Sequence, residues 1–74
     1  MAEKITITNT IRKLRFFANE MTQAQLAEHV GVSRQTIIAI ESGRYAPSLE
    51  LAFRIARAFG VEIGEVFVCE GGED

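Results

Sequence analysis

The chain has 74 residues, of which 47% are apolar and 24% are charged. This composition predicts one small globular domain and excludes a disordered chain. No run of apolar residues approaches the roughly 18 that a transmembrane helix needs, and no apolar signal sequence follows the first residues. One cysteine and one histidine exclude an internal disulfide and a zinc site built from these residue types. We expect a cytoplasmic protein with no cofactor, no metal and no membrane contact.

Charge is distributed unevenly along the chain, whose net charge is −2. Residues 1–46 contain six basic and four acidic residues, whereas residues 47–74 contain two basic and six acidic residues. This asymmetry favours a molecule with one face suited to an anion. Solvated surfaces often carry a bias of this size, so the charge distribution alone does not identify a partner.

The first predicted element is a strand over residues 5–8, where Ile-Thr-Ile-Thr alternates apolar and polar side chains. Asn9 or Thr10 then caps a helix that ends at Asn19, a residue type that adopts the left-handed conformation readily. The inward-facing residues expected of this helix are Ile11, Leu14, Phe17 and Ala18. The neighbouring Phe16 is expected to be partly exposed or to pack beneath the terminal strands.

The middle of the chain predicts two helices joined by a tight turn. Thr22 and Gln25 form a capping box at the start of the first of these helices, which ends at Gly31. Ser33 caps the next helix, which ends at Gly43. The apolar residues that fill the angle between the two helices are Leu26, Ala27, Val30, Val32, Ile37 and Ile40.

Two further helices and a second strand complete the predicted elements. Ser48 caps a fourth helix that ends at Gly60, and a short fifth helix is predicted over residues 62–66. The inward-facing residues of the fourth helix are Leu51, Ala52, Ile55, Ala56 and Phe59. Residues 66–69, Val-Phe-Val-Cys, predict a strand, with a continuing helix as the alternative. The tail over residues 70–74 is expected to be flexible.

The two predicted strands lie at opposite ends of the chain. A lone strand leaves its backbone N–H and C=O groups without partners. The simplest solution pairs residues 4–8 with residues 66–70 in a small antiparallel sheet, and the alternative pairs strands of two subunits. The sequence therefore predicts a mostly α-helical single domain over residues 1–74, with five helices and a two-stranded sheet from the chain termini.

The spacing over residues 22–43 is typical of a helix-turn-helix motif. The small side chain of Ala27 lets the second helix cross closely, and Gly31 permits the turn between the helices. An ordinary pair of packed helices is the alternative interpretation. The two interpretations differ in what the second helix, residues 33–42, exposes.

The outward positions of that second helix suit the edges of DNA bases. Arginine can bind guanine through two hydrogen bonds, and glutamine can bind adenine in the same way. Ile38 and Ala39 are apolar and suit the methyl group of thymine. The outward-facing residues are Ser33, Arg34, Gln35, Thr36, Ile38, Ala39 and Ser42. This composition favours a recognition helix that lies in the major groove.

Residues 21–50 resemble the λ repressor/Cro-like (XRE) helix-turn-helix family, through the sequence MTQAQLAEHVGVSRQTIIAIESGRYAPSLE. The resemblance extends over residues 9–67 and is closest to small stand-alone regulators of the cytolysin repressor type. It implies five helices, a two-stranded sheet from the chain ends, and a homodimer. Phe16 and Phe17 depart from the family pattern, because many members carry charged residues there.

The resemblance also implies roles for particular residues. Gln23 stands at the position that binds a DNA phosphate and braces the recognition helix. The base and flanking phosphate contacts fall on Arg34, Gln35 and Thr36, with Ile38 and Ala39 deeper in the groove. The loop that meets backbone phosphates carries Ser42, Arg44 and Tyr45.

Two further groups of charged residues have alternative interpretations. Glu41, at the end of the recognition helix, is expected to brace the fold rather than contact DNA, because a carboxylate repels phosphate. Its partner is an arginine, either Arg15 or Arg54. The basic cluster of Arg12, Lys13 and Arg15 is either a solvated face or a phosphate-facing one.

The C-terminal third carries more apolar surface than so few residues need for a core. We expect part of it to form a two-fold dimer interface. The residues expected in this interface are Ile63, Val66, Phe67 and Val68. Such a dimer would place two recognition helices roughly 34 Å apart, on an inverted-repeat operator.

The sequence therefore favours a homodimeric, sequence-specific transcription regulator that binds double-stranded DNA, a repressor more than an activator. An antitoxin that also binds a toxin, and a protein-interaction module that has lost DNA binding, are the alternatives. An enzyme is not expected, because the sequence has no nucleophile–base pair, metal cluster or glycine-rich phosphate loop. No set of residues predicts a small-molecule pocket.

Overall fold

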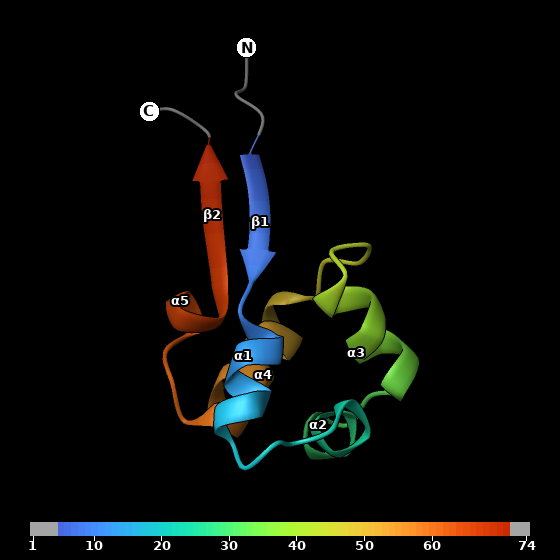
Figure 1. The fold of residues 1–74 in the computed structure, drawn as a ribbon. Helices are drawn as coiled ribbons and strands as arrows, with labels where there is room; N and C mark the ends of the chain where they lie inside the picture. Colours follow the sequence, from blue (N-terminus) through green and yellow to red (C-terminus); the bar gives the residue numbers. More distant parts are fainter. Residues whose placement is uncertain (1–4, 72–74) are drawn as a thin grey trace.

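The computed structural model describes residues 5–71, which fold into five helices and a two-stranded sheet (Figure 1). The elements are β1 (Ile5–Asn9), α1 (Ile11–Phe17), α2 (Gln23–Val30), α3 (Arg34–Glu41), α4 (Leu49–Phe59), α5 (Ile63–Val66) and β2 (Phe67–Gly71). The helices form one body, and the sheet projects away from it. This architecture confirms the predicted fold class. None of the helices described is both long and apolar enough to cross a membrane.

The sheet pairs β1 with β2 in the antiparallel direction within one chain. Ile7 lies opposite Cys69, and Asn9 lies opposite Phe67. This pairing confirms the sheet predicted from the two ends of the chain. Glu70 and Gly71 belong to β2, so the expectation of a flexible tail from residue 70 onward is wrong for these two residues. Lys4, and residues 72–74 of the expected tail, lie outside the described residues.

The core lies between the helices and is built from small and branched apolar side chains. Its buried members are Ile11, Leu26, Ala27, Val30, Ile37, Ile40, Leu51, Ala52, Ile55, Ala56 and Val66. Leu14, Val32 and Phe59 pack against them while staying partly exposed. The inward faces predicted for the second, third and fourth helices are therefore confirmed.

The inward face of α1 differs from the prediction. Phe16 and Phe17 are 63% and 69% exposed, so Phe17 does not belong to the core. At about 100° per residue, Phe17 points roughly 120° away from Ile11, whereas Arg15 points within about 40° of it. Arg15 is half-buried and takes the inward place that sequence reasoning gave to the aromatic residue. The inward face of α1 therefore includes a charged residue, Arg15.

The predicted helix ends are found where side chains or glycines stabilise them. Thr22 and Gln25 form the expected capping box, and Ser33 and Ser48 accept hydrogen bonds from the N–H groups of the first turns of α3 and α4. Asn19 adopts a φ of 62°, which is the left-handed conformation expected after α1.

The start of α1 is stabilised by two residues in different ways. The side chain of Asn9 accepts a hydrogen bond from the Ile11 N–H at 3.2 Å. Thr10 occupies the cap position without a side-chain cap bond. Its hydroxyl donates to the Glu65 carbonyl at 2.6 Å, and its N–H donates to the Val66 carbonyl at 2.8 Å. Thr10 therefore joins α1 to α5.

Candidate nucleic-acid interface

Helices α2 and α3 meet at a turn whose geometry depends on one glycine. Gly31 ends α2 with a φ of 80°, and the next N–H, of Val32, donates to the Ala27 carbonyl at 3.0 Å. Ala27 is 3% exposed and Ile37 is completely buried, so the two helices contact each other closely. The small residue and the glycine serve the purposes expected from the sequence.

The first turn of α3 presents two long polar side chains to solvent. Arg34 and Gln35 are both exposed, and within residues 5–71 neither side chain forms a hydrogen bond. The hydroxyls of Ser33 and Thr36 lie 3.0 Å apart, and the Ser33 hydroxyl also accepts from the Thr36 N–H at 3.1 Å, so both side chains are partly engaged. Arg34 and Gln35 are therefore the residues of this turn that are free to bind a ligand.

The following turn of α3 is less exposed than the first. Ile38 and Ala39 are half-buried, so they expose a smaller fraction of their surface to solvent than Arg34 and Gln35 do. Ile37 and Ile40 face the core from the opposite side of the helix. An α-helix in the major groove brings such short apolar groups close to the bases only when the helix inserts deeply.

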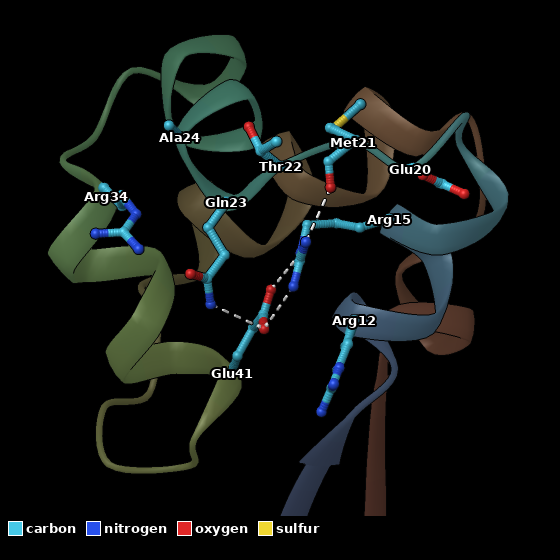
Figure 2. Close-up of a pocket in the computed structure, with 9 residues that line it drawn as sticks. All are labelled: Arg12, Arg15, Glu20, Met21, Thr22, Gln23, Ala24, Arg34 and Glu41. Atoms are coloured by element: carbon cyan, nitrogen blue, oxygen red, sulfur yellow. Dashed lines mark hydrogen bonds and ion pairs between the residues drawn. The ribbon is translucent and has the colours of Figure 1, made fainter.

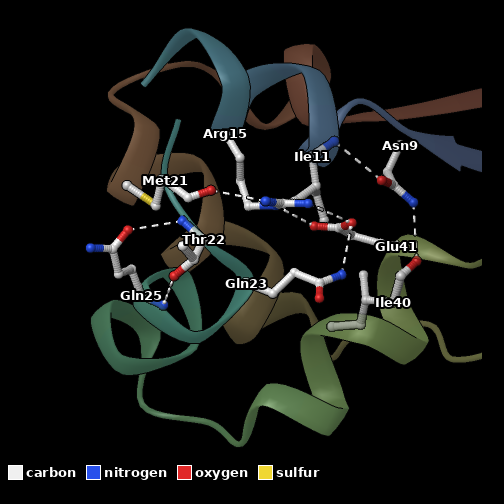
Figure 3. A network of polar contacts seen from close by, with 9 residues as sticks. All are labelled: Asn9, Ile11, Arg15, Met21, Thr22, Gln23, Gln25, Ile40 and Glu41. Atoms are coloured by element: carbon white, nitrogen blue, oxygen red, sulfur yellow. Dashed lines mark hydrogen bonds and ion pairs between the residues drawn. The ribbon is translucent and has the colours of Figure 1, made fainter. Parts of the chain in front are cut away.

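A network of charged side chains fixes the far end of α3 (Figure 3). Arg15 Nε donates to Glu41 Oε2 at 2.7 Å, and Arg15 Nη2 donates to Glu41 Oε1 at 3.2 Å. Gln23 Nε2 donates to the same Oε1 atom at 3.3 Å, and Arg15 Nη1 donates to the Met21 carbonyl at 2.8 Å. One carboxylate thus joins α1, the start of α2 and the end of α3.

This network settles which arginine is the partner of Glu41. Arg15 forms the predicted pair, whereas Arg54 binds Glu50 one turn earlier on α4 at 2.7 Å. Arg54 also donates to the Val30 carbonyl at 3.3 Å, close to the turn of the motif. The prediction that Glu41 braces the fold is confirmed.

An open hollow of about 450 Å³ lies between α1, the start of α2 and α3 (Figure 2). Arg34 lies on one side of it and Arg12 on the other, with the Glu41 network between them. Its lining residues are Arg12, Arg15, Glu20, Met21, Thr22, Gln23, Ala24, Arg34 and Glu41. Because Glu41 pairs with Arg15, Arg12 and Arg34 are the cations of this hollow that remain available to an anion.

The sequence alone leaves open whether Arg12 lies on a solvated face or on a phosphate-facing one. It lies three residues before Arg15, and residues at this spacing share one face of a helix. The position of Arg15 at the hollow, opposite Glu41, therefore brings Arg12 to its edge. Once the Arg15–Glu41 pair is known, this spacing is the signal that selects Arg12 from the basic cluster.

The three candidate residues of the loop after α3 lie in different surroundings. Ser42 donates its hydroxyl hydrogen to the Ala39 carbonyl at 3.0 Å. Arg44 is exposed, beyond Gly43, whose φ is 81°. Tyr45 is 50% exposed and lines a second hollow, of about 290 Å³, beside the sheet. Tyr45 is thus separated from the hollow that Arg34 lines.

The residues expected in a dimer interface also differ in how much of their surface is exposed. Val66 is completely buried within the subunit, so its side chain cannot take part in an interface, and we correct that expectation. Ile63 and Phe67 are half-buried against the core, and Val68 is 37% exposed. Less apolar surface is exposed here than the sequence predicts, because Val66 of α5 is part of the core.

A short helix joined by a tight turn to a second helix with an exposed polar first turn defines a helix-turn-helix DNA-binding domain. The sequence profile of the helix-turn-helix family HTH_3, of XRE type, matches residues 11–66, and the chain belongs to this family.

Related proteins carry matching names. An HTH-type transcriptional regulator of Methanocaldococcus jannaschii is 54% identical over 63 residues, which cover 82% of this chain and 96% of that protein. One from Methanothermobacter thermautotrophicus is 63% identical over 51 residues, covering 68% of this chain and 74% of that protein. The cryptic phage CTXphi transcriptional repressor RstR of Vibrio cholerae is 34% identical over 59 residues, covering 80% of this chain and 52% of the repressor.

Family membership makes the chain a DNA-binding transcription regulator and not an enzyme, as the sequence predicted.

Proposed function

We propose that the protein is a repressor that binds an inverted-repeat operator as a homodimer in the cytoplasm. Helix α3 lies in the major groove, and Arg34, Gln35 and Ile38 read base edges. Gln23, Ser33, Thr36, Ala39, Ser42, Arg44 and Tyr45 complete the contact surface expected from the sequence. Arg12 joins this surface as a phosphate contact, because it borders the same hollow as Gln23 and Arg34.

One observation carries this proposal: Arg34 and Gln35 lie exposed in the first turn of α3 without any polar partner among residues 5–71. Water satisfies such exposed side chains in the free protein, so both are available to form hydrogen bonds with a ligand that reaches this turn. In helix-turn-helix proteins, the N-terminal residues of the second helix contact the bases. Arg12, on the opposite side of the hollow from Arg34, supplies part of the phosphate attraction on which affinity depends.

The names of two relatives favour repression over activation. The CTXphi protein is named a transcriptional repressor, and a Bacillus phage phi105 protein, 34% identical over 62 residues, is named an immunity repressor. The matched region covers 84% of this chain and 42% of the phi105 protein. A repressor needs only to occupy its operator, so a DNA-binding domain by itself meets the physical requirement.

Selection from a random duplex DNA pool tests the proposal. The wild-type protein is compared with the Arg34→Ala, Gln35→Ala double variant, and Arg57→Ala serves as a control that removes an exposed cation of α4. We expect the wild type and the control to enrich the same inverted repeat, and the double variant to enrich none. Half-site spacing then reports the separation of the two α3 helices in the dimer.

Two results would overturn parts of the proposal. Enrichment of a single half-site without symmetry would argue against the homodimer and leave DNA reading by α3 intact. Failure of every protein to enrich a sequence, with weak binding even at low salt, would favour the alternative of a protein-interaction module or antitoxin.

A further inference from the structure

The outer face of α1 carries two aromatic and two basic side chains that the core does not use. We call Arg12, Lys13, Phe16 and Phe17 the α1 patch. The phenyl rings of Phe16 and Phe17 are 63% and 69% exposed and meet edge to face, with centroids 5.3 Å apart. Single exposed apolar residues are common, but two adjacent rings on one helical turn form a continuous apolar surface.

The α1 patch borders an open hollow of about 590 Å³. Asn9 and Thr10, together with the four patch residues, line this hollow, and no acidic side chain does. Within residues 5–71, neither Arg12 nor Lys13 forms an ion pair, in contrast to Arg15 and Arg54. The hollow therefore combines an apolar floor with uncompensated positive charge.

The stability of the fold does not account for these residues. Ile11 and Leu14 attach α1 to the core, and Arg15 attaches it to α3. Phe16 and Phe17 lie outside the core, and solvating a phenyl ring is unfavourable by comparison with burying it. A ligand that covers the two rings would recover apolar burial that folding leaves unused.

We propose that the α1 patch binds an acidic, amphipathic segment of a partner protein. Apolar side chains of the segment cover Phe16 and Phe17, and its carboxylates pair with Arg12 and Lys13. On α1, Arg12 and Phe16 are four residues apart, as are Lys13 and Phe17, so each cation lies one turn from a ring. A helix with acidic and apolar residues at the same spacing matches this arrangement.

Duplex DNA fits the two rings of the α1 patch less well than such a segment, although Arg12 at the edge of the patch also borders the hollow beside α3. The DNA backbone supplies negative charge, but its charged phosphates leave little apolar surface to cover two phenyl rings. A second copy of the chain is the other possible source of acidic and apolar side chains. Glu65, an exposed acid of α5, already accepts a hydrogen bond from the Glu62 N–H at 3.1 Å through its Oε2 atom, and the dependence of binding on protein concentration distinguishes this occupant from a partner segment.

A labelled synthetic peptide of about 15 residues tests the proposal by fluorescence anisotropy with the full chain. The probe carries leucine and phenylalanine on one helical face and glutamate and aspartate on the other. One control peptide replaces the acids with lysine, and a second replaces the apolar residues with alanine. We expect only the probe to bind, with amide shifts in ¹⁵N spectra confined to α1 and its neighbours.

Matched variants assign the binding to the rings and the cations. The Phe16→Ser, Phe17→Ser variant should weaken probe binding at least about tenfold, and Arg12→Gln, Lys13→Gln should weaken it severalfold. Phe53→Ser and Arg57→Gln remove an exposed ring and an exposed cation of α4, and both should bind the probe like the wild type. Shift mapping on the wild type provides an independent readout if a variant does not fold.

Several results would overturn the proposal. No probe binding at about 1 mM, or equal binding of either control peptide, would remove the partner chemistry that we assign. Tighter binding of a single-stranded oligonucleotide to the same residues would make the patch a nucleic-acid surface. Amide shifts in α1 that depend on protein concentration without any peptide would make a second copy its occupant.

Discussion

Arg15 joins three parts of the molecule through a single guanidinium group. It binds both carboxylate oxygens of Glu41 and the carbonyl of Met21. The side chains of Arg15 and Glu41 are 15% and 11% exposed, so the pair is largely removed from water. Because water is mostly excluded, each charge depends on the other for its stabilisation.

Removing Arg15 should therefore destabilise the protein more than removing a surface cation. We expect Arg15→Ala to lower the free energy of unfolding by about 2–3 kcal/mol, because Glu41 stays nearly buried without its cation. Urea unfolding followed by circular dichroism measures the change. The control is Glu50→Ala, which breaks the exposed pair with Arg54 and should change stability by less than about 0.5 kcal/mol. Equal effects of the two variants would contradict this interpretation.

Arg34 and Arg12 should differ in how their loss affects DNA binding. Arg34→Ala should weaken binding to the selected operator by about 1–3 kcal/mol and relax the preference at one base position. Arg12→Ala should weaken binding about equally on all sequences and reduce the slope of log affinity against log salt by about one. Titrations of the operator and its single-base variants at several salt concentrations separate these effects. A sequence-independent loss for Arg34→Ala would instead make that residue a phosphate contact.

At the scale of elements, the turn between α2 and α3 depends on the backbone of Gly31. An added Cβ would lie 3.6 Å from Arg54 Nη1, an ordinary contact, so space does not exclude a larger residue. The φ of 80° is the constraint, because residues with a Cβ are disfavoured in this region. A residue with a Cβ would therefore fit into the space at this turn, but the positive φ would strain its backbone.

Replacement of Gly31 by alanine should lower the free energy of unfolding by about 1–2 kcal/mol. Gly64, inside α5, provides the control, since an added Cβ there meets nothing within 4 Å and its φ is not positive. Gly64→Ala should leave stability unchanged or raise it by up to about 1 kcal/mol. Thermal unfolding of both variants measures the difference. If Gly31→Ala proved as stable as Gly64→Ala, the left-handed turn would not limit stability.

Helix boundaries and inward faces were predictable where local rules decide them. Thr22, Ser33 and Ser48 are side-chain caps, and Gly31 and Gly60 end their helices with positive φ. These features depend on a few neighbouring residues, so a sequence pattern contains them. The motif of α2 and α3 belongs to this predictable part.

The errors arose where tertiary contacts decide. The place of Arg15 on the buried face of α1 depends on Glu41, which is 26 positions away in the chain. Hydrophobicity alone predicts that Phe17 belongs to the core, although Arg15 has the better angular position. The burial of Val66 likewise depends on how α5 docks, and no local pattern reports that.

At the scale of the whole molecule, the sheet has an apolar face that a single subunit leaves exposed. Side chains of paired residues in an antiparallel sheet point to the same face, so Ile5, Ile7, Phe67 and Cys69 share one face. Ile5 and Ile7 are each 51% exposed. Two-stranded sheets are only marginally stable in water unless something covers an apolar face. We therefore favour this face as the contact between subunits of the proposed homodimer.

Two neighbouring substitutions on β1 test which face forms the dimer. Ile7→Asp places a charge on the apolar face and should convert the dimer to monomer at micromolar concentration. Thr8→Asp places the same charge on the opposite face, beside Val68, and should leave the dimer intact. Sedimentation equilibrium measures both. Dissociation by Thr8→Asp alone would move the interface to the face of Val68, and a monomeric wild type would reject the dimer.

The pairing of β1 with β2 also has a consequence for the order in which the chain folds. The contacts between α2, α3 and α4 close short loops, whereas the pairing of Ile5 with Gly71 closes a loop of nearly the whole chain. Long loops carry a larger entropy of closure, and non-local pairings form more slowly. The helices are thus expected to assemble before the sheet. A newly made subunit would then be able to contact a half-site before it has the surface with which to dimerise.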